Sequence, residues 1–342
     1  MSVEFSLSNP SRNMINQSVK DFSRAGADPA PDTPRAPSVR TQGTCFGFEL
    51  HSAIPFRCLR NGSGAPLEVR DSPVAQVAEP GRFVGEWAAG PEPSVFARLY
   101  NDGQVYRLWT RGGGWSLIEP RIPRITLPPF DDPALSEENI WNIPIALCLL
   151  HRGDLALHAA AVEINGSALM LVAPGGSGKT TLAAAFAQEG YRVLSEDVAC
   201  ITIDGAPSIV PGPAMLRLRP DVVSSLHLPA AQVIRRLPSR ITVALSTENR
   251  GNCHPVPLAA IVVLERVAAE FETERIPAAD AVPAVWPLTF VMPSDEWQTF
   301  CFTRLVDMVK TVPVWRFARP LQFSALPETV ARLAALCADG QF

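Results

Sequence analysis

Residues 173–181 read Ala-Pro-Gly-Gly-Ser-Gly-Lys-Thr-Thr, a glycine-rich turn that ends in a lysine and two threonines. An apolar run, residues 167–172, precedes the turn and an amphipathic stretch, residues 180–189, follows it. This order predicts a strand, a tight loop and a helix. Successive backbone N–H groups in such a loop point at one place, where the helix N-terminus also favours negative charge. The chain therefore has to contain an α/β unit with a loop suited to phosphate.

The segment matches the pattern G-x-x-x-x-G-K-[ST] at Gly178, Lys179 and Thr180, with Ala173 in place of the first glycine. That first position needs only a small residue. In this motif the lysine reaches the β- and γ-phosphates of a nucleotide, and the hydroxyl ligates Mg²⁺. The alternative is a flexible Gly/Ser turn before a helix. We expect ATP and Mg²⁺ to bind here, with the nucleotide held by Gly175, Gly176, Ser177, Gly178, Lys179, Thr180 and Thr181.

An acidic pair, Glu196 and Asp197, follows one helix and one strand after Lys179. We expect the strand at residues 191–194 to run beside the loop and to bring both carboxylates to the γ-phosphate. One would hold Mg²⁺ together with Thr180, and the other would take the proton from an attacking hydroxyl. The residues alone leave open which acid does which. The alternative is a pair that faces solvent at the end of a strand.

His158 lies in an apolar stretch, residues 155–164, that Asn165-Gly166 joins to residues 168–172. Asn-Gly between two apolar runs predicts an antiparallel hairpin, so the strand that enters the loop is expected to be one arm of it. His158 then lies near the nucleotide. It is either a catalytic group that orients or relays a proton, or an ordinary strand residue.

Several arginines are further candidates for anion contacts. Arg217 and Arg219 alternate along a predicted strand and therefore share a face, where they either clamp a phosphate or acidic acceptor or lie on the surface. Arg240 belongs to a second cluster, with Arg235 and Arg236. Arg250 and His254 are weaker candidates for stabilising a transferred phosphoryl group.

The remaining pattern predicts three parts. Residues 1–43 are polar and rich in Pro, Ala and Asp, which predicts a disordered or loosely attached arm. Residues 44–133 contain short alternating runs, with an Asn101-Asp-Gly turn between two of them, and predict a small β-rich, antiparallel domain. Residues 134–342 are expected to form the kinase-type domain, entered through one helix over residues 135–150.

Composition excludes other classes. A net charge of −4 gives no general attraction to nucleic acid or acidic membranes. The seven cysteines are scattered without a C-x-x-C pair, so neither a zinc site nor a disulfide framework is indicated. No apolar run approaches the ~20 residues of a membrane span, and the first residues lack a signal-peptide pattern. We expect a cytoplasmic protein.

Three segments, Leu157-His-Ala-Ala-Ala-Val-Glu-Ile-Asn-Gly, the loop 173–181 and Gly190-Tyr-Arg-Val-Leu-Ser-Glu-Asp, together resemble the HPr kinase/phosphorylase family. The resemblance covers residues 155–205 most clearly. It implies an α/β fold with a mixed sheet, related to phosphoenolpyruvate carboxykinase, and transfer of phosphate from ATP to a serine hydroxyl with Mg²⁺. It places Lys179 and Thr180 in the nucleotide and metal roles, Glu196 and Asp197 in the acid pair, and His158 in the histidine position.

The chain departs from the family at two of these positions, with Ala159 where glycine is usual and Glu196 where aspartate is usual. The glycine-rich stretch of the bifunctional enzymes has no match after Arg219, which argues against phosphorylase activity and against HPr as the substrate. The layout more closely resembles HPr-kinase-like proteins of peptide biosynthesis, some of which phosphorylate a precursor peptide on serine, as in lasso-peptide pathways. The resemblance also implies homo-oligomers.

Two other functions remain open. A small-molecule kinase of the shikimate type also carries an acid one helix and one strand after its lysine, but it begins at the loop and continues from the acids into a helix. Here a hairpin precedes the loop, and residues 198–203 stay extended. A non-catalytic ATP-binding regulator could keep all four of Lys179, Thr180, Glu196 and Asp197.

Overall fold

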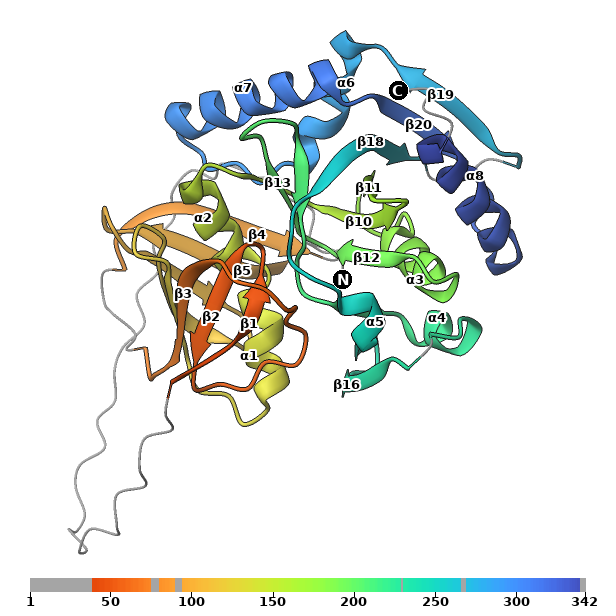
Figure 1. The fold of residues 1–342 in the computed structure, drawn as a ribbon. Helices are drawn as coiled ribbons and strands as arrows, with labels where there is room; N and C mark the ends of the chain where they lie inside the picture. Colours follow the sequence, from red (N-terminus) through yellow and green to blue (C-terminus); the bar gives the residue numbers. More distant parts are fainter. Residues whose placement is uncertain (1–38, 75–79, 90–93, 229, 266–268, 339–342) are drawn as a thin grey trace, which may run out of the picture.

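The structure, a computed structural model, describes residues 39–74, 80–89, 94–228, 230–265 and 269–338. The fold is mixed α/β, and its described strands form sheets of eight, nine and three strands (Figure 1). Residues 1–38 of the expected arm lie outside the described residues, and the first strand already begins at Arg40. No helix in the described part of the chain is long and apolar enough to cross a membrane.

The eight-stranded sheet occupies residues 40–127 and has the order β1-β2-β3-β8-β7-β6-β5-β4. Its strands are β1 (Arg40–Cys45), β2 (Phe48–Ser52), β3 (Ala65–Asp71), β4 (Arg82–Ala89), β5 (Ser94–Asn101), β6 (Tyr106–Thr110), β7 (Gly114–Glu119) and β8 (Arg124–Leu127). The hairpin expected at Asn101 is confirmed, because β5 and β6 pair antiparallel across that turn. A wholly antiparallel sheet is wrong: β3 pairs in parallel with β2 and β8. Residues 53–64 between β2 and β3 are long enough for the crossover that parallel pairing needs.

The single helix expected over residues 135–150 is also wrong. The structure has two helices, α1 (Pro133–Ile140) and α2 (Ile143–Arg152), separated at Trp141 and Asn142. Pro144 lies in the first turn of α2, where its missing N–H costs nothing, whereas inside one continuous helix it would remove a hydrogen bond and clash with the preceding turn.

The nine-stranded sheet carries the glycine-rich loop. Its strands are β9 (Leu155–Leu157), β10 (Ala159–Ile164), β11 (Ser167–Val172), β12 (Arg192–Ser195), β13 (Ala199–Thr202), β14 (Ser208–Val210), β18 (Val256–Leu264), β19 (Glu272–Ile276) and β20 (Val314–Ala318). The predicted hairpin of β10 and β11 is confirmed, with Asn165 and Gly166 both at positive φ between Ile164 and Ser167. β11, β18 and β20 run in parallel, so their carboxyl ends lie at one edge of the sheet.

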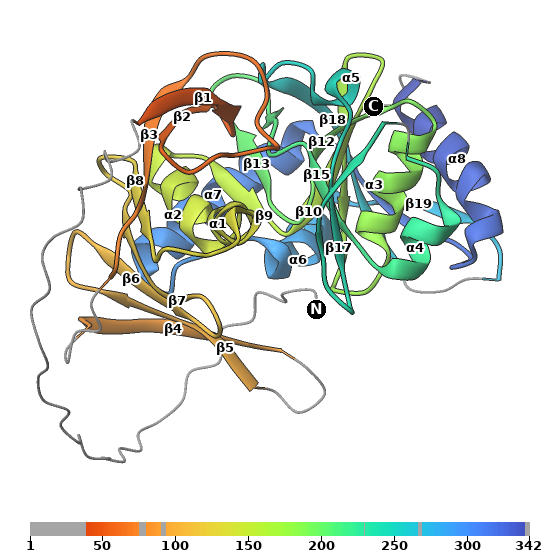
Figure 2. The ribbon, with the colours of Figure 1, turned by 90° about the horizontal axis from the view of Figure 1, so that it is seen from below.

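The two faces of this sheet carry separate cores, and residues along β11 alternate between them. Ala168, Met170 and Val172 pack in the core that contains α2, α6 (Ala278–Val285) and α7 (Asp295–Thr311). Leu169 and Leu171 pack in the other core, against α3 (Lys179–Gln188) and α8 (Leu326–Ala338). The eight-stranded sheet and the α3–α8 side therefore lie at opposite ends of the molecule (Figure 2). The sequence pattern also predicts a strand at 258–264 and helices at 295–312 and 327–338, and the structure has β18, α7 and α8 there.

The three-stranded sheet has the order β15-β17-β16 and lies beside α3. It comprises β15 (Met215–Leu218), β16 (Gln232–Arg236) and β17 (Ile241–Ala244), with the short helices α4 (Pro220–Ser225) and α5 (Thr247–Arg250) at its ends. Leu216 and Leu218 face the α3 core, so Arg217 between them projects to the other side.

A fully buried arginine, Arg60, ties the first sheet to the second. Its guanidinium donates to the carbonyls of Gly212 (2.7 Å), Val193 (2.7 Å) and Leu194 (3.1 Å). Burial lowers the pKa of Arg60 to about 9, and no carboxylate among the described residues forms an ion pair with it. Arg60 thus fixes the first sheet to β12, the strand that leads to the acidic pair.

Candidate functional site

The glycine-rich loop connects β11 to α3 and contains Gly175, Gly176, Ser177 and Gly178. Gly176 and Gly178 have φ of +80° and +87°, which glycine adopts without strain. A Cβ on Gly178 would lie 2.7 Å from Nη2 of Arg319, so a side chain there would displace the guanidinium. The first N–H groups of α3 have no partner within the helix, and they create the positive end that suits an anion.

Lys179 begins α3, and its side chain turns back over the loop. The ammonium donates to the carbonyls of Ala173 (2.5 Å) and Pro174 (3.3 Å) and lies 3.2 Å from Nε2 of His158. Only 7% of the Lys179 surface is exposed. The positive charge therefore lies inside the site, at the loop, where the sequence predicts it.

His158 lies at the break between β9 and β10, so the single strand expected over residues 155–164 is wrong. At this point the strands change partners, β9 pairing with β13 and β10 with β12 and β11. The backbone N–H of His158 donates to the carbonyl of Leu288 (2.7 Å), which lies outside the named strands. Its ring is buried, and Nδ1 lies 3.0 Å from Oδ1 of Asp197. The break places the imidazole between Lys179 and the acidic pair.

Glu196 and Asp197 follow β12, which pairs with β10 and is therefore one strand away from β11. A tight turn shapes the pair: the N–H of Val198 donates to the carbonyl of Glu196 (2.9 Å) around Asp197, whose φ is +70°. Such three-residue turns with positive φ are strained. Consecutive residues of an extended strand face opposite ways, but here both carboxylates contact Arg217.

Arg217 on β15 pairs with both acids. Its Nε lies 3.3 Å from Oε2 of Glu196, and its Nη2 donates to Oδ2 of Asp197. Burial acts to raise the pKa of Asp197, but the charges of Arg217 and the contact with His158 outweigh it and hold that pKa well below its usual value. Burial raises the pKa of Glu196, with Arg217 offsetting part of the effect. The pKa values of the two neighbouring carboxyls are therefore shifted in opposite directions, that of Glu196 up and that of Asp197 down.

Thr180 completes the expected metal ligands. Its hydroxyl donates to Oε1 of Glu196 over 2.8 Å. A hydroxyl and a carboxylate beside a phosphate-type loop are oxygen ligands of the kind that Mg²⁺ prefers. Among the described residues, no group of three or more His, Cys, Asp and Glu side chains is placed to hold a metal. Thr180 and Glu196 fit a Mg²⁺ that takes its other ligands from phosphate and water.

Arg217 and Arg219, which are predicted to share a face, both line the cavity of Lys179 and the acidic pair. β15 ends at Leu218, and Arg219 pairs with the exposed Asp221 at the start of α4. Arg240 lines the same cavity as Lys179 and the acidic pair. Arg250 lies in α5, and neither it nor His254 is among the residues that line this cavity.

Sequence reasoning missed Arg319, which follows β20. Its side chain is 98% buried, as only 2% is exposed, and it lies against Gly178. The signal was present in the topology: residues after parallel strands meet at one sheet edge, and β20 ends at the same edge as β11. That parallel order cannot be read from the local pattern around Arg319.

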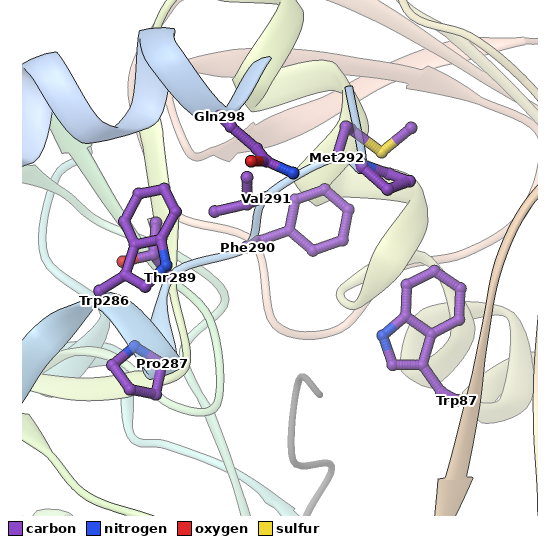
Figure 3. Close-up of a pocket in the computed structure, with 9 residues that line it drawn as sticks. Trp87, Trp286, Pro287, Thr289, Phe290, Val291, Met292 and Gln298 are labelled. Atoms are coloured by element: carbon purple, nitrogen blue, oxygen red, sulfur yellow. The ribbon is translucent and has the colours of Figure 1, made fainter. Parts of the chain in front are cut away.

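A separate cavity, lined by both polar and apolar groups, lies outside the cavity that holds Lys179 and the acidic pair. Trp87 of β4 and Trp286, Phe290 and Met292 from the segment before α7 line it (Figure 3). The backbone of this segment pairs with β9, since Phe290 N–H donates to the Ala156 carbonyl (2.8 Å). No Lys, Arg, Asp or Glu is among its lining residues, so it does not suit phosphate.

No protein-family model and no curated protein matches the chain. Among solved structures, the chain is similar to the Hpr(Ser) kinase/phosphatase from Coxiella burnetii, with 12% sequence identity and a TM-score of 0.28. The alignment covers 54% of this chain and 99% of that chain. Similarity at this level supports no conclusion about fold or activity, and function has to be inferred from the side chains of the site.

Proposed function

We propose that the protein is an HPr-kinase-like, ATP- and Mg²⁺-dependent kinase that transfers the γ-phosphate to a serine hydroxyl of a protein or ribosomally made precursor peptide in the cytoplasm. One observation carries the proposal: Lys179, Thr180, His158, Glu196, Asp197 and Arg217 line one cavity at the N-terminus of α3. Phosphoryl transfer requires mainly positioning and charge stabilisation, and this cavity supplies both.

The contacts suggest a division of roles. Glu196 accepts a hydrogen bond from Thr180, so these two side chains would hold Mg²⁺, which neutralises phosphate charge when bound. Asp197 is then the acid left to accept the hydrogen bond of the serine hydroxyl and to take its proton during transfer. His158 and Arg217 hold the Asp197 carboxylate in place.

The positive groups stabilise the transferred phosphoryl group in this proposal. Lys179 and Arg217 are both largely buried in the cavity, where a charge acts with little screening. Arg217 contacts both acids, so a phosphoryl group that attracts Arg217 would weaken its hold on Asp197 and make that carboxylate a better proton acceptor.

The test is transfer of labelled γ-phosphate from ATP, with Mg²⁺, into a lysate of the native organism supplemented with peptides encoded beside the gene. Wild type is compared with Asp197→Asn and with Asp307→Asn, an exposed aspartate of α7 that serves as the control. A protein or peptide labelled by wild type and Asp307→Asn alone supports the proposal. Label only in a small metabolite indicates a small-molecule kinase. ATP binding without any labelled product indicates a non-catalytic regulator.

A further inference from the structure

A second cavity opens from the glycine-rich loop on the side away from the acidic pair. It has a volume of about 140 Å³, which is less than the ~300–1,000 Å³ of a whole small-molecule site and gives room for one part of a ligand. Gly176, Gly178, Thr181 and Arg219 line both this cavity and the one that holds Lys179 and the acids. The two cavities are therefore continuous around the loop, and a ligand whose phosphates lie at the loop has space to extend away from Glu196 and Asp197.

Arg319 lines this second cavity, and its buried guanidinium has few hydrogen-bond partners. Its side chain is 98% buried, and its Nε has no hydrogen-bond partner. Its Nη1 has a long contact, 3.5 Å, to the carbonyl of Pro320, and no carboxylate in the described part of the chain pairs with it. Burial lowers the pKa of Arg319 to about 10. A buried guanidinium without a counter-charge is costly, and an anion beside Gly178 would remove that cost.

The outer part of the cavity is apolar. Leu321 and Phe323 are among the large hydrophobic side chains that stay exposed, at 47% and 40%, and Leu326 lies buried beneath them. These residues follow Arg319 in the chain: Leu321 precedes the turn η2 (Phe323–Ala325), Phe323 begins it, and Leu326 begins α8. Flat apolar faces of this kind bind aromatic rings by stacking.

We propose that this second cavity binds the nucleoside end of the nucleotide, with the base against Leu321 and Phe323 and with Arg319 donating to a phosphate oxygen next to Gly178. The proposal rests on the proposed function for its ligand, a nucleoside triphosphate. In this arrangement the acceptor and the γ-phosphate lie at the acidic pair. The remaining phosphates lie at the glycines and Arg319, and the base lies at Phe323.

The experiment compares the binding of ATP and of inorganic tripolyphosphate, each with Mg²⁺, by isothermal titration calorimetry on the full chain. The variants are Phe323→Ala, at a side chain that is 40% exposed, and Arg319→Gln. Their controls are Phe302→Ala, at a phenylalanine of α7 that is 51% exposed, and Arg316→Gln, an exposed arginine of β20 paired with Glu265 and Glu274.

We expect Phe323→Ala to raise the Kd of ATP about tenfold or more, as loss of base stacking does, and to leave the Kd of tripolyphosphate unchanged. Arg319→Gln should weaken both ligands, and both controls should behave as wild type. An unchanged ATP affinity in Phe323→Ala overturns this placement of the base, and so does equal weakening of both ligands. If wild type binds neither ligand, the proposed function fails as well, whereas ATP binding that ignores Phe323 overturns this inference alone.

Discussion

Lys179 Nζ lies 3.2 Å from Nε2 of His158, whose other ring nitrogen lies 3.0 Å from Oδ1 of Asp197. A charged ammonium can only donate, so Nε2 accepts from Lys179 and Nδ1 carries the proton that faces Asp197. The histidine therefore links the cation of the glycine-rich loop to the acid proposed as proton acceptor. His158 is therefore a positioning residue between the Lys179 ammonium and the Asp197 carboxylate.

Replacing Lys179 by methionine should lower phosphate transfer by roughly 10²–10³-fold, because the cation at the loop is lost. The fold should persist, since methionine fills similar space. The matched control is Lys310→Met, at an exposed lysine of α7 paired with Asp307. Rates are measured with labelled ATP, and circular dichroism checks the fold. Equal rates in the two variants would contradict the role of Lys179.

Asp197→Asn and Asp197→Ala should both abolish transfer but differ in stability. Loss of the carboxylate leaves Arg217 and His158 with a weaker partner, which for a buried pair costs about 3 kcal/mol or more. Asparagine tolerates the positive φ of +70°, whereas alanine adds ~1 kcal/mol of strain. Urea unfolding should therefore rank wild type above the asparagine variant and alanine last.

The stability gained by Glu196→Gln should increase with pH. The folded state raises the pKa of Glu196 above its ordinary 4.5, so its contribution to stability is fully present below that value and is lost as pH rises through the folded pKa. Glutamine has no such loss. Free energies of unfolding, measured from pH 4 to pH 8 without nucleotide or metal, should favour the variant progressively at higher pH. A difference that does not change with pH would show that Glu196 is not destabilised by burial.

Gly178→Ala should weaken ATP binding, because its Cβ would meet Nη2 of Arg319 at 2.7 Å and its φ is +87°. Gly205→Ala is the control: φ is +100° there, but no atom lies within 4 Å of the added Cβ. Both variants should lose ~1–2 kcal/mol of stability from backbone strain, and only Gly178→Ala should also lose ATP affinity in calorimetry. Loss of affinity in both would trace the effect to strain alone.

Arg60→Met should destabilise the whole chain by ~3 kcal/mol or more, since it removes the buried hydrogen bonds from Arg60 to the carbonyls of Gly212, Val193 and Leu194. Arg57→Met, at an exposed neighbour, is the control. Hydrogen exchange should show faster opening of β12 and of the first sheet together in Arg60→Met. Faster exchange in only one of them would argue against a link through Arg60.

Local pattern predicts the parts of this structure that local physics decides. Asn165-Gly166 specifies the hairpin, and the glycines with Lys179 and Thr180 specify the loop and the start of α3. Features that depend on contacts between distant parts of the chain could not be predicted from local pattern. Parallel pairing of β3 depends on a crossover, and the position of Arg319 depends on which strands are parallel. Arg219 pairs with Asp221 and Arg217 with the acidic pair because β15 ends at Leu218, a strand end that alternation alone does not mark.

The turn at Asp197 makes the order of Glu196 and Asp197 in the chain matter, and not only their charge. Asp197 is the residue with positive φ, a conformation that aspartate adopts more readily than most residues. Glu196, the residue before it, has the longer side chain, and this side chain contacts Thr180. The same two acids in reverse order would carry the same charge but a different geometry. Substitutions that conserve acidity at these positions are therefore not interchangeable.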